Sequence, residues 1–141
     1  MSDVLECQEM RMLVEGEMAF LAAERWAPDD MVRLEAALRD MSREEDELGT
    51  VEEDLAFHAA IVAASHNKMG MAVYASMMPS IRVGMNMQRG VYKLLPKSRK
   101  PQGLKEHRAI LDLIRDRNAA EVRAAIHNHI SYFHSDLKRY R

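Results

Sequence analysis

The sequence has little of several residue types that mark particular classes of protein. It has one cysteine, Cys7, so it can form no internal disulfide and has no cysteine cluster for zinc, which fits a reducing compartment. No apolar run reaches the roughly 20 residues that a membrane-spanning helix needs. The start at residues 1–6 is acidic, whereas a signal peptide begins with basic residues. These features predict a cytoplasmic protein without a membrane segment, in which Cys7 is an ordinary thiol.

Sequence motifs of enzymes are also missing. There is no H-E-x-x-H motif, no E-x-x-H motif of the di-iron bundles and no glycine-rich phosphate loop. No serine or cysteine has a recognisable nucleophile setting, and no carboxylate arrangement marks His58 as a base rather than a ligand. The sequence therefore predicts a protein that is not an enzyme.

Acidic residues are missing from the whole middle of the chain. Residues 1–54 carry 17 acids and 5 bases, residues 55–105 carry 8 bases and no acid, and residues 106–141 carry 5 acids and 7 bases. The middle segment is either a buried centre with a few bases at its surface or a positive field directed at an anion. The net charge of −2 lacks the basic excess of DNA-binding domains, which argues against direct DNA contact.

The sequence is rich in the signals that begin and end helices. Apolar residues recur at three and four positions, and the Asn-Gly and Asp-Gly turns of hairpins are missing. Pro28, the capping box of residues 50–53 and Asn67 mark helix starts. Helices are predicted at residues 3–26, 28 to about 48–49, 50–65, 67–92 with a bend at Pro79, 104–115 and 118–139, with a basic loop at 93–103. A chain of 141 residues is one domain, here an all-α antiparallel bundle.

Four side chains are candidates for a metal site. Asp54 and His58 lie four residues apart in a predicted helix, so they project from the same face. His107 and His129 lie on two further predicted helices, beside apolar residues at helical spacing. If the three histidines converge with Asp54, they form an N3O set that suits Zn, Ni, Mn or Fe. Spacing alone leaves open that these are solvated or core residues.

Other histidines and the methionines are expected to be structural. His127 cannot join the site together with His129, because residues two apart on a helix point about 200° from each other. His66 and His134 are assigned structural roles. Six of the 12 methionines lie in the predicted helix 67–92. Met-x-Met pairs on a helix do not converge on one ion, so these thioethers are expected to fill an adaptable core beside a cavity.

Two arginines of the same predicted helix, Arg82 and Arg89, are seven residues apart. They are either solvated or interface residues, or a fork for a carboxylate that enters the bundle.

Six residue groups along the chain are specific when taken together. They are Arg11 with Glu15, LAAER at 21–25, DLAFH at 54–58, ASHN at 64–67, EHRAIL at 106–111 and AAIHNHI at 124–130. In this order, and with His107 and His129 separated by 22 positions, they resemble the metal-binding branch of one family. That family is the FadR C-terminal ligand-binding (FCD) domain of GntR-type bacterial transcription regulators.

The resemblance implies a bundle of six or seven helices, usually a homodimer, that senses a small metabolite and controls a DNA-binding domain. It implies that a divalent ion, zinc before Ni, Mn or Fe, helps anchor a small carboxylate. By this resemblance the ligands are Asp54, His58, His107 and His129. Arg82, and behind it Arg11, match the arginines that hold the effector. A winged helix-turn-helix precedes the domain in family regulators, whereas Met1 opens almost directly into the first helix, so residues 1–141 are expected to be a single FCD domain without DNA contact of its own.

Two alternatives stay open. A metal-free bundle would only dimerise or would bind acyl chains in a methionine-lined cavity. A metal-dependent hydrolase or lyase could use the same ligands, since a metal ion with open positions can activate water. That enzyme would need a general base, and residues 55–105 contain no Asp or Glu to provide one.

Overall fold

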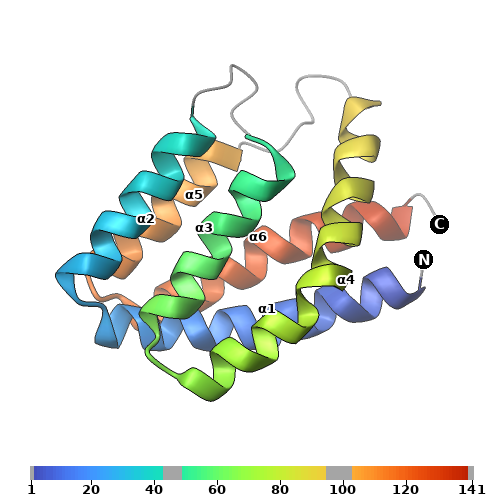
Figure 1. The fold of residues 1–141 in the computed structure, drawn as a ribbon. Helices are drawn as coiled ribbons and strands as arrows, with labels where there is room; N and C mark the ends of the chain where they lie inside the picture. Colours follow the sequence, from blue (N-terminus) through green and yellow to red (C-terminus); the bar gives the residue numbers. More distant parts are fainter. Residues whose placement is uncertain (1, 43–48, 95–102, 140–141) are drawn as a thin grey trace.

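Six helices make up the part of the chain that this computed structural model describes, which is residues 2–42, 49–94 and 103–139. They are α1 (Ser2–Arg25), α2 (Pro28–Met41), α3 (Val51–Ala64), α4 (Lys68–Lys93), α5 (Gly103–Arg115) and α6 (Ala119–Arg139). Figure 1 shows α1 and α6 running side by side beneath α2, α3 and α5, while α4 closes the remaining side. The prediction of an all-α bundle is confirmed.

Local hydrogen bonds start these helices where the sequence predicted. The Thr50 hydroxyl accepts from the Glu53 amide at 3.1 Å, and the Glu53 carboxylate accepts from the Thr50 amide at 2.7 Å, which completes the capping box of α3. Asn67 caps α4 by accepting from the Gly70 amide at 3.0 Å. The start of α3 is therefore fixed just before Asp54.

The end of α2 differs from the prediction. The helix ends at Met41, whereas the sequence favoured an end near Leu48–Gly49. The Ser42 hydroxyl and amide both donate to the carbonyls of Leu38 and Arg39, which closes the last turn. Four acids follow at positions 44–47, where the negative end of a helix dipole disfavours them. Residues 43–48, like most of the predicted basic loop at 95–102, lie outside the described residues.

The apolar core has two main parts. Side chains of five helices form the larger part, namely Ala19, Ala22, Ala23, Leu34, Leu38, Met41, Phe57, Ile61, Ala64, Ile110, Leu111, Ile114, Val122, Ile126 and Ile130. The smaller part joins α1, α3 and α4, and consists of Met18, Leu55, Val62, Tyr74, Ile81 and Met85. Pro79 lies inside α4, and the ribbon of α4 changes direction along its length (Figure 1). Both parts of the core meet at α3, which is therefore held on both sides.

Small residues let α1 approach α6 closely. A Cβ atom at Gly16 would lie 2.5 Å from Nε2 of His127, so only glycine fits there without displacing the ring. His127 thus faces α1.

Cys7 is half-buried and free. Within the described residues, none of the helices combines the length and apolar character that crossing a bilayer would require.

Candidate metal centre

The four predicted ligands come together in the middle of the bundle. Asp54 and His58 reach in from α3, His107 from α5 and His129 from α6, and one potential ligand atom of each lies within 4.8 Å of the others. Nε2 of His107 is 3.1 Å from Oδ1 of Asp54, and Nε2 of His58 is 3.2 Å from the same oxygen. His58 and His107 are each 1% exposed. The cluster is therefore a largely buried N3O set, in which the side chain of His129 is 17% exposed, rather than a group of surface residues.

The imidazole rings are in mutual contact. The rings of His58 and His129 stack with centroids 5.4 Å apart, and the ring of His107 stands edge-on to His129 at 4.6 Å. Among the described residues, Nε2 of His58 has no hydrogen-bond partner, although it is buried and faces a carboxylate. Buried polar atoms are rarely left in this state, so the arrangement fits a ring nitrogen that serves as a metal ligand.

Charged side chains from other helices hold three of the four candidate ligands from outside. Glu15 of α1 contacts Nδ1 of His58 at 2.6 Å, and Glu106 of α5 contacts Nδ1 of His129 at 2.9 Å. Both contacts leave Nε2 of the ring for the centre of the cluster. Arg89 of α4 donates to Oδ2 of Asp54 at 3.2 Å and to the Gly49 carbonyl at 2.6 Å, which leaves Oδ1 of Asp54 on the inner side. Such outer contacts orient metal ligands in many proteins.

The pKa values in the cluster are set by burial against neighbouring charges. Burial alone would raise the pKa of Asp54, but the imidazoles of His107 and then of His58 beside its carboxylate hold that pKa well below its usual range. Burial lowers the pKa of His58, yet the carboxylates of Glu15 and Asp54 outweigh it and raise the value to about 9. Burial, together with the nearby histidines, lowers the pKa of His129 to about 4. The neighbouring imidazoles thus favour the ionised form of Asp54, whereas burial favours the neutral form of His129.

The arginines predicted to hold an effector lie in two different environments. Arg82 is at the surface, where its Nε donates to Oε1 of Glu52 at 2.7 Å. Arg11 is 4% exposed and donates from Nε to Oε2 of Glu15 at 2.5 Å. The arginine that reaches the cluster directly is Arg89. Sequence spacing could not tell which of the two arginines reaches the cluster, because both contact the first turn of α3. Arg89 contacts its buried side at Asp54, and Arg82 contacts its exposed side at Glu52.

The remaining histidines lie away from the cluster where their side chains are described. Nε2 of His66 is 2.6 Å from Oδ2 of Asp30, in a contact that joins the turn after α3 to the start of α2. His127 faces Gly16, as expected from its position two residues before His129. The side chain of His134 lies outside the described residues.

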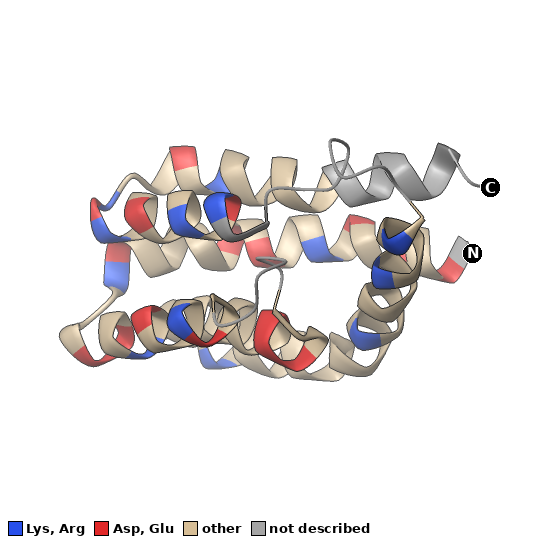
Figure 2. Ribbon diagram, turned by 90° about the horizontal axis from the view of Figure 1, so that it is seen from above, with Lys and Arg blue, Asp and Glu red and all other residues tan. Residues whose placement is uncertain are grey.

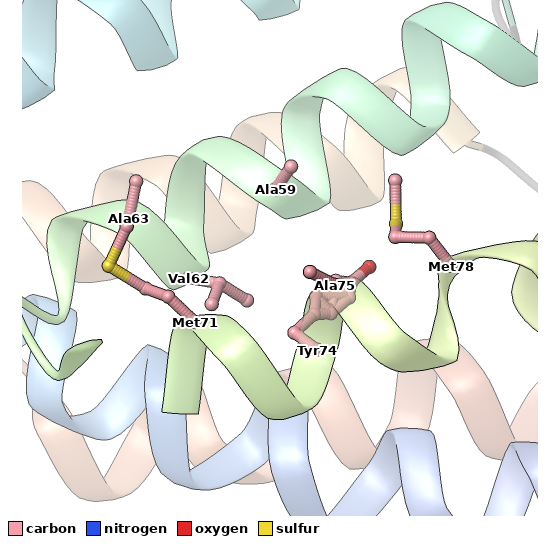
Figure 3. Close-up of a pocket in the computed structure, with 7 residues that line it drawn as sticks. All are labelled: Ala59, Val62, Ala63, Met71, Tyr74, Ala75 and Met78. Atoms are coloured by element: carbon pink, nitrogen blue, oxygen red, sulfur yellow. The ribbon is translucent and has the colours of Figure 1, made fainter. Parts of the chain in front are cut away.

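One hollow of the described structure borders the cluster, and a second lies apart from it, lined by none of the four candidate ligands. One, of about 350 Å³, lies between α5 and α6 and is lined by Glu106, Ala109, Ile110, Ala125, Asn128 and His129. The other, of about 240 Å³, lies between α3 and α4 and is lined by Ala59, Val62, Ala63, Met71, Tyr74, Ala75 and Met78 (Figure 3). The second hollow is apolar, and the thioethers of Met71 and Met78 stand at its two ends.

Charge is distributed unevenly around these hollows. In Figure 2, basic segments are coloured along α4 but acidic ones are not, in keeping with its four bases and no acid. The first turn of α3 contributes Glu52, Glu53 and Asp54. Arg89 of α4 meets Asp54 of α3 beside the cluster, whereas Arg82 of α4 meets Glu52 of α3 at the surface.

Comparisons with known proteins agree with this architecture. The family model described as the FCD domain matches residues 6–132. The chain is 34% identical over 119 residues to the galactonate operon transcriptional repressor of Escherichia coli K12, which covers 80% of this chain and 49% of that protein. It is 31% identical over 140 residues to the HTH-type transcriptional regulator LutR of Bacillus subtilis 168, which covers 98% of this chain and 64% of LutR.

Two further similarities extend this picture. The putative L-lactate dehydrogenase operon regulatory protein of Escherichia coli K12 is 27% identical over 138 residues, covering 98% of this chain and 52% of that protein. A solved structure of Streptococcus agalactiae GntR superposes with a TM-score of 0.74 at 22% identity, covering 96% of this chain and 59% of that chain, and so shares its fold. The chain spans between 49% and 64% of the length of these curated relatives.

Proposed function

Since this chain belongs to the FCD domain family and its relatives are GntR-family transcription regulators, we propose that it is the effector-sensing domain of such a regulator. In this proposal it binds a divalent metal and a small organic acid, and it acts as a homodimer that controls an attached DNA-binding domain. The observation that carries the proposal is the buried convergence of one carboxylate and three imidazoles at the centre of the bundle.

The donor set favours a borderline metal ion. Asp54 would provide an oxygen, and His58, His107 and His129 would each provide a ring nitrogen, which suits zinc first and Ni, Mn or Fe as alternatives. When bound, such an ion supplies coordination positions that an oxygen ligand can occupy. The residues of the chain orient the donors and exclude water, because the ligands of α3 and α5 are buried in the described structure.

A carboxylate is the effector class that fits the charges of the site. Three carboxylates, Asp54, Glu15 and Glu106, face two guanidinium groups, Arg11 and Arg89, around the cluster. A divalent ion would add two positive charges to this nearly balanced set, and an anionic ligand would offset them. Arg89 is the arginine best placed to meet that anion beside Asp54, and Arg11 lies behind Glu15. Arg82 stays a predicted effector contact.

The names of two relatives narrow the class further. One refers to galactonate and another to L-lactate, and both acids carry a hydroxyl group on the carbon next to the carboxylate. The carboxylate and hydroxyl oxygens of a 2-hydroxy acid can occupy two neighbouring positions of one ion. We therefore propose small 2-hydroxy acids as the first ligands to test. Binding would change the regulator only by the difference in affinity between its two states.

The metal content of purified, untagged protein tests this proposal. Elemental mass spectrometry is expected to find about one divalent ion per chain in the wild type and to find it lost in His129→Ala. His127→Ala is the matched control, because its ring lies two residues away on the same helix and faces α1. A panel of organic acids should then raise the melting temperature of the metal-loaded protein.

Two results would contradict the proposal. If neither protein holds metal after incubation with Zn, Ni and Mn, the site is not a metal centre, and apolar ligands in the cavity between α3 and α4 become the candidates. If metal binds but no organic acid stabilises the loaded protein, the effector class is wrong.

A further inference from the structure

A buried ion pair on α1 touches the candidate metal centre from outside. Glu15 is 2% exposed and Arg11 is 4% exposed, which is unusual for charged residues. The two oxygens of the Glu15 carboxylate are used separately: Oε2 accepts from Nε of Arg11 at 2.5 Å, and Oε1 contacts Nδ1 of His58 at 2.6 Å. The chain Arg11–Glu15–His58 therefore runs from α1 into α3.

This chain determines which nitrogen of His58 faces the cluster. A neutral imidazole carries its proton on one of two nitrogens, and a carboxylate beside Nδ1 keeps the proton there. Nε2 of His58, which lies 3.2 Å from Oδ1 of Asp54, is then the nitrogen whose lone pair a metal ion at the centre would use. Without Glu15, the ring could carry its proton on Nε2 or rotate, and either change would remove a ligand.

Glu15 has a buried arginine as its partner, which distinguishes it from Glu106, the other carboxylate that contacts a candidate ligand. Glu106 holds His129 in the same way, but the Glu106 side chain is 35% exposed. Water can replace a half-exposed carboxylate as a hydrogen-bond acceptor, whereas a fully buried position offers no such replacement. Arg11 holds the Glu15 carboxylate in place through its hydrogen bond to Oε2, so we expect the contact of Glu15 with His58 to matter more than that of Glu106 with His129.

We propose that Arg11 and Glu15 are a positioning pair that orients His58 for the metal and thereby couples α1 to metal occupancy. The inference rests on the proposed metal site. The four candidate ligands lie on α3, α5 and α6, whereas α1 packs against α3, α4, α5 and α6. Through Glu15, an ion at the centre would be linked to this long helix without binding to it.

The test compares zinc affinity with folding stability. In the double variant Arg11→Met/Glu15→Leu, both charges are replaced by apolar side chains, so neither charge is left buried alone. We expect this variant to fold but to bind zinc about 10- to 100-fold more weakly in competition with a chromophoric chelator. Arg11→Met/Glu15→Gln keeps an acceptor for Nδ1 of His58 and should recover part of the loss. Glu17→Leu, an exposed site on the same helix, is the matched control and should bind zinc like the wild type.

Two readouts separate positioning from mere packing. Long-range proton–nitrogen NMR spectra of the zinc-loaded wild type should show the proton of His58 on Nδ1, and this signal should be lost in Arg11→Met/Glu15→Leu. Hydrogen exchange should show zinc protecting residues 8–19 of α1 in the wild type but not in that variant. A double variant that binds zinc as tightly as the wild type would overturn the inference.

The proposed function can fail separately from this inference. If the wild type binds no zinc, the metal proposal fails, while the hydrogen bond between Nδ1 of His58 and Glu15 can still be observed in the metal-free protein. If zinc binds and the proton of His58 is found on Nε2, then Nε2 is not the nitrogen that binds zinc. The positioning role proposed for Glu15 would then be wrong.

Discussion

Two arginine–glutamate pairs with similar geometry show how strongly the environment decides what an ion pair does. Arg11 and Glu15 are 2.5 Å apart, and their side chains are 4% and 2% exposed. Arg82 and Glu52 are 2.7 Å apart, and their side chains are 43% and 68% exposed. Water competes for the second pair and screens it, whereas the first pair has only protein groups as partners.

The pKa values of the two glutamates follow this difference. Burial would raise the pKa of Glu15, but the charges of Arg11 and His58 outweigh it and lower the value to about 2. The pKa of Glu52 is lowered mainly by its hydrogen bond from Arg82. Glu15 thus depends on two specific neighbours inside the bundle, and the buried pair borders the candidate metal centre while the exposed pair lies at the surface.

Breaking the buried pair from one side should have the largest effect. Glu15→Leu would leave the guanidinium of Arg11 buried without its carboxylate, at a cost of about 3–5 kcal/mol in the free energy of unfolding. Urea unfolding of the metal-free protein measures this loss. Arg11→Met/Glu15→Leu is the control and should recover most of it, because no charge is stranded. Equal losses in the single and double variants would show that shape, rather than charge, makes this pair important.

Zinc is expected to raise the free energy of unfolding by binding at the buried cluster, which the exposed pair Arg82–Glu52 does not contact. A ligand that binds only the folded state, at 100 times its dissociation constant, adds about 2.7 kcal/mol to the free energy of unfolding. We expect this gain in wild-type protein and in the control His127→Ala, but not in His107→Ala. Unfolding curves with zinc and with a chelator measure it. A similar gain in His107→Ala would place the zinc away from the cluster.

Asp30 is an intermediate case, since its buried carboxylate has exposed partners. It is 2% exposed and accepts from the Ala27 amide at 2.8 Å, while its partners Arg33 and His66 are 61% and 50% exposed. Asp30→Ala removes the N-terminal contact of α2 and should cost about 1–2 kcal/mol. The neighbouring exposed Asp29→Ala is the matched control, with an expected loss of a few tenths.

The pH dependence of Asp30 has a definite sign. Burial raises its pKa, but the hydrogen bonds from Ala27, His66 and Arg33 outweigh burial and lower it below the usual value. A carboxyl with a depressed pKa in the folded state stabilises the protein above its unfolded pKa of about 3.9, and this contribution is lost as the pH falls. The difference in stability between wild type and Asp30→Ala should therefore shrink on acidification. A difference that grows below pH 4 would contradict this assignment.

Local signals explain how much of the fold could be predicted from the sequence. The capping box of Thr50 and Glu53 and the cap of Asn67 involve residues three apart, so their sequence pattern is also their structure. The end of α2 was predicted too late, because the closing bonds of Ser42 have no strong sequence signal. The pairing of Asp54 with His58 was equally local, since residues four apart share a helix face.

The convergence of the site depended on tertiary packing. Helical spacing did not show that His107 and His129 would meet Asp54, and the resemblance to the FCD domain carried that expectation. The outer contacts were not predicted. Glu106 is adjacent to His107 in sequence but contacts His129, and Glu15 lies 43 positions from His58. No periodicity links such pairs, because they depend on how α1, α5 and α6 pack.

The smallest expected effect on stability is at the exposed pair, and it tests the comparison most directly. Arg82→Gln should leave the urea midpoint unchanged, because water replaces the contact with Glu52. Arg89→Gln, seven residues along the same helix, is the matched variant, and it removes the donor to Oδ2 of Asp54. If burial decides function, Arg89→Gln should lose binding of 2-hydroxy acids to the zinc-loaded protein, and Arg82→Gln should lose less, as calorimetry can measure. A greater loss in Arg82→Gln would instead confirm the effector contact predicted from the sequence, and would mean that this arginine leaves Glu52 when the acid binds.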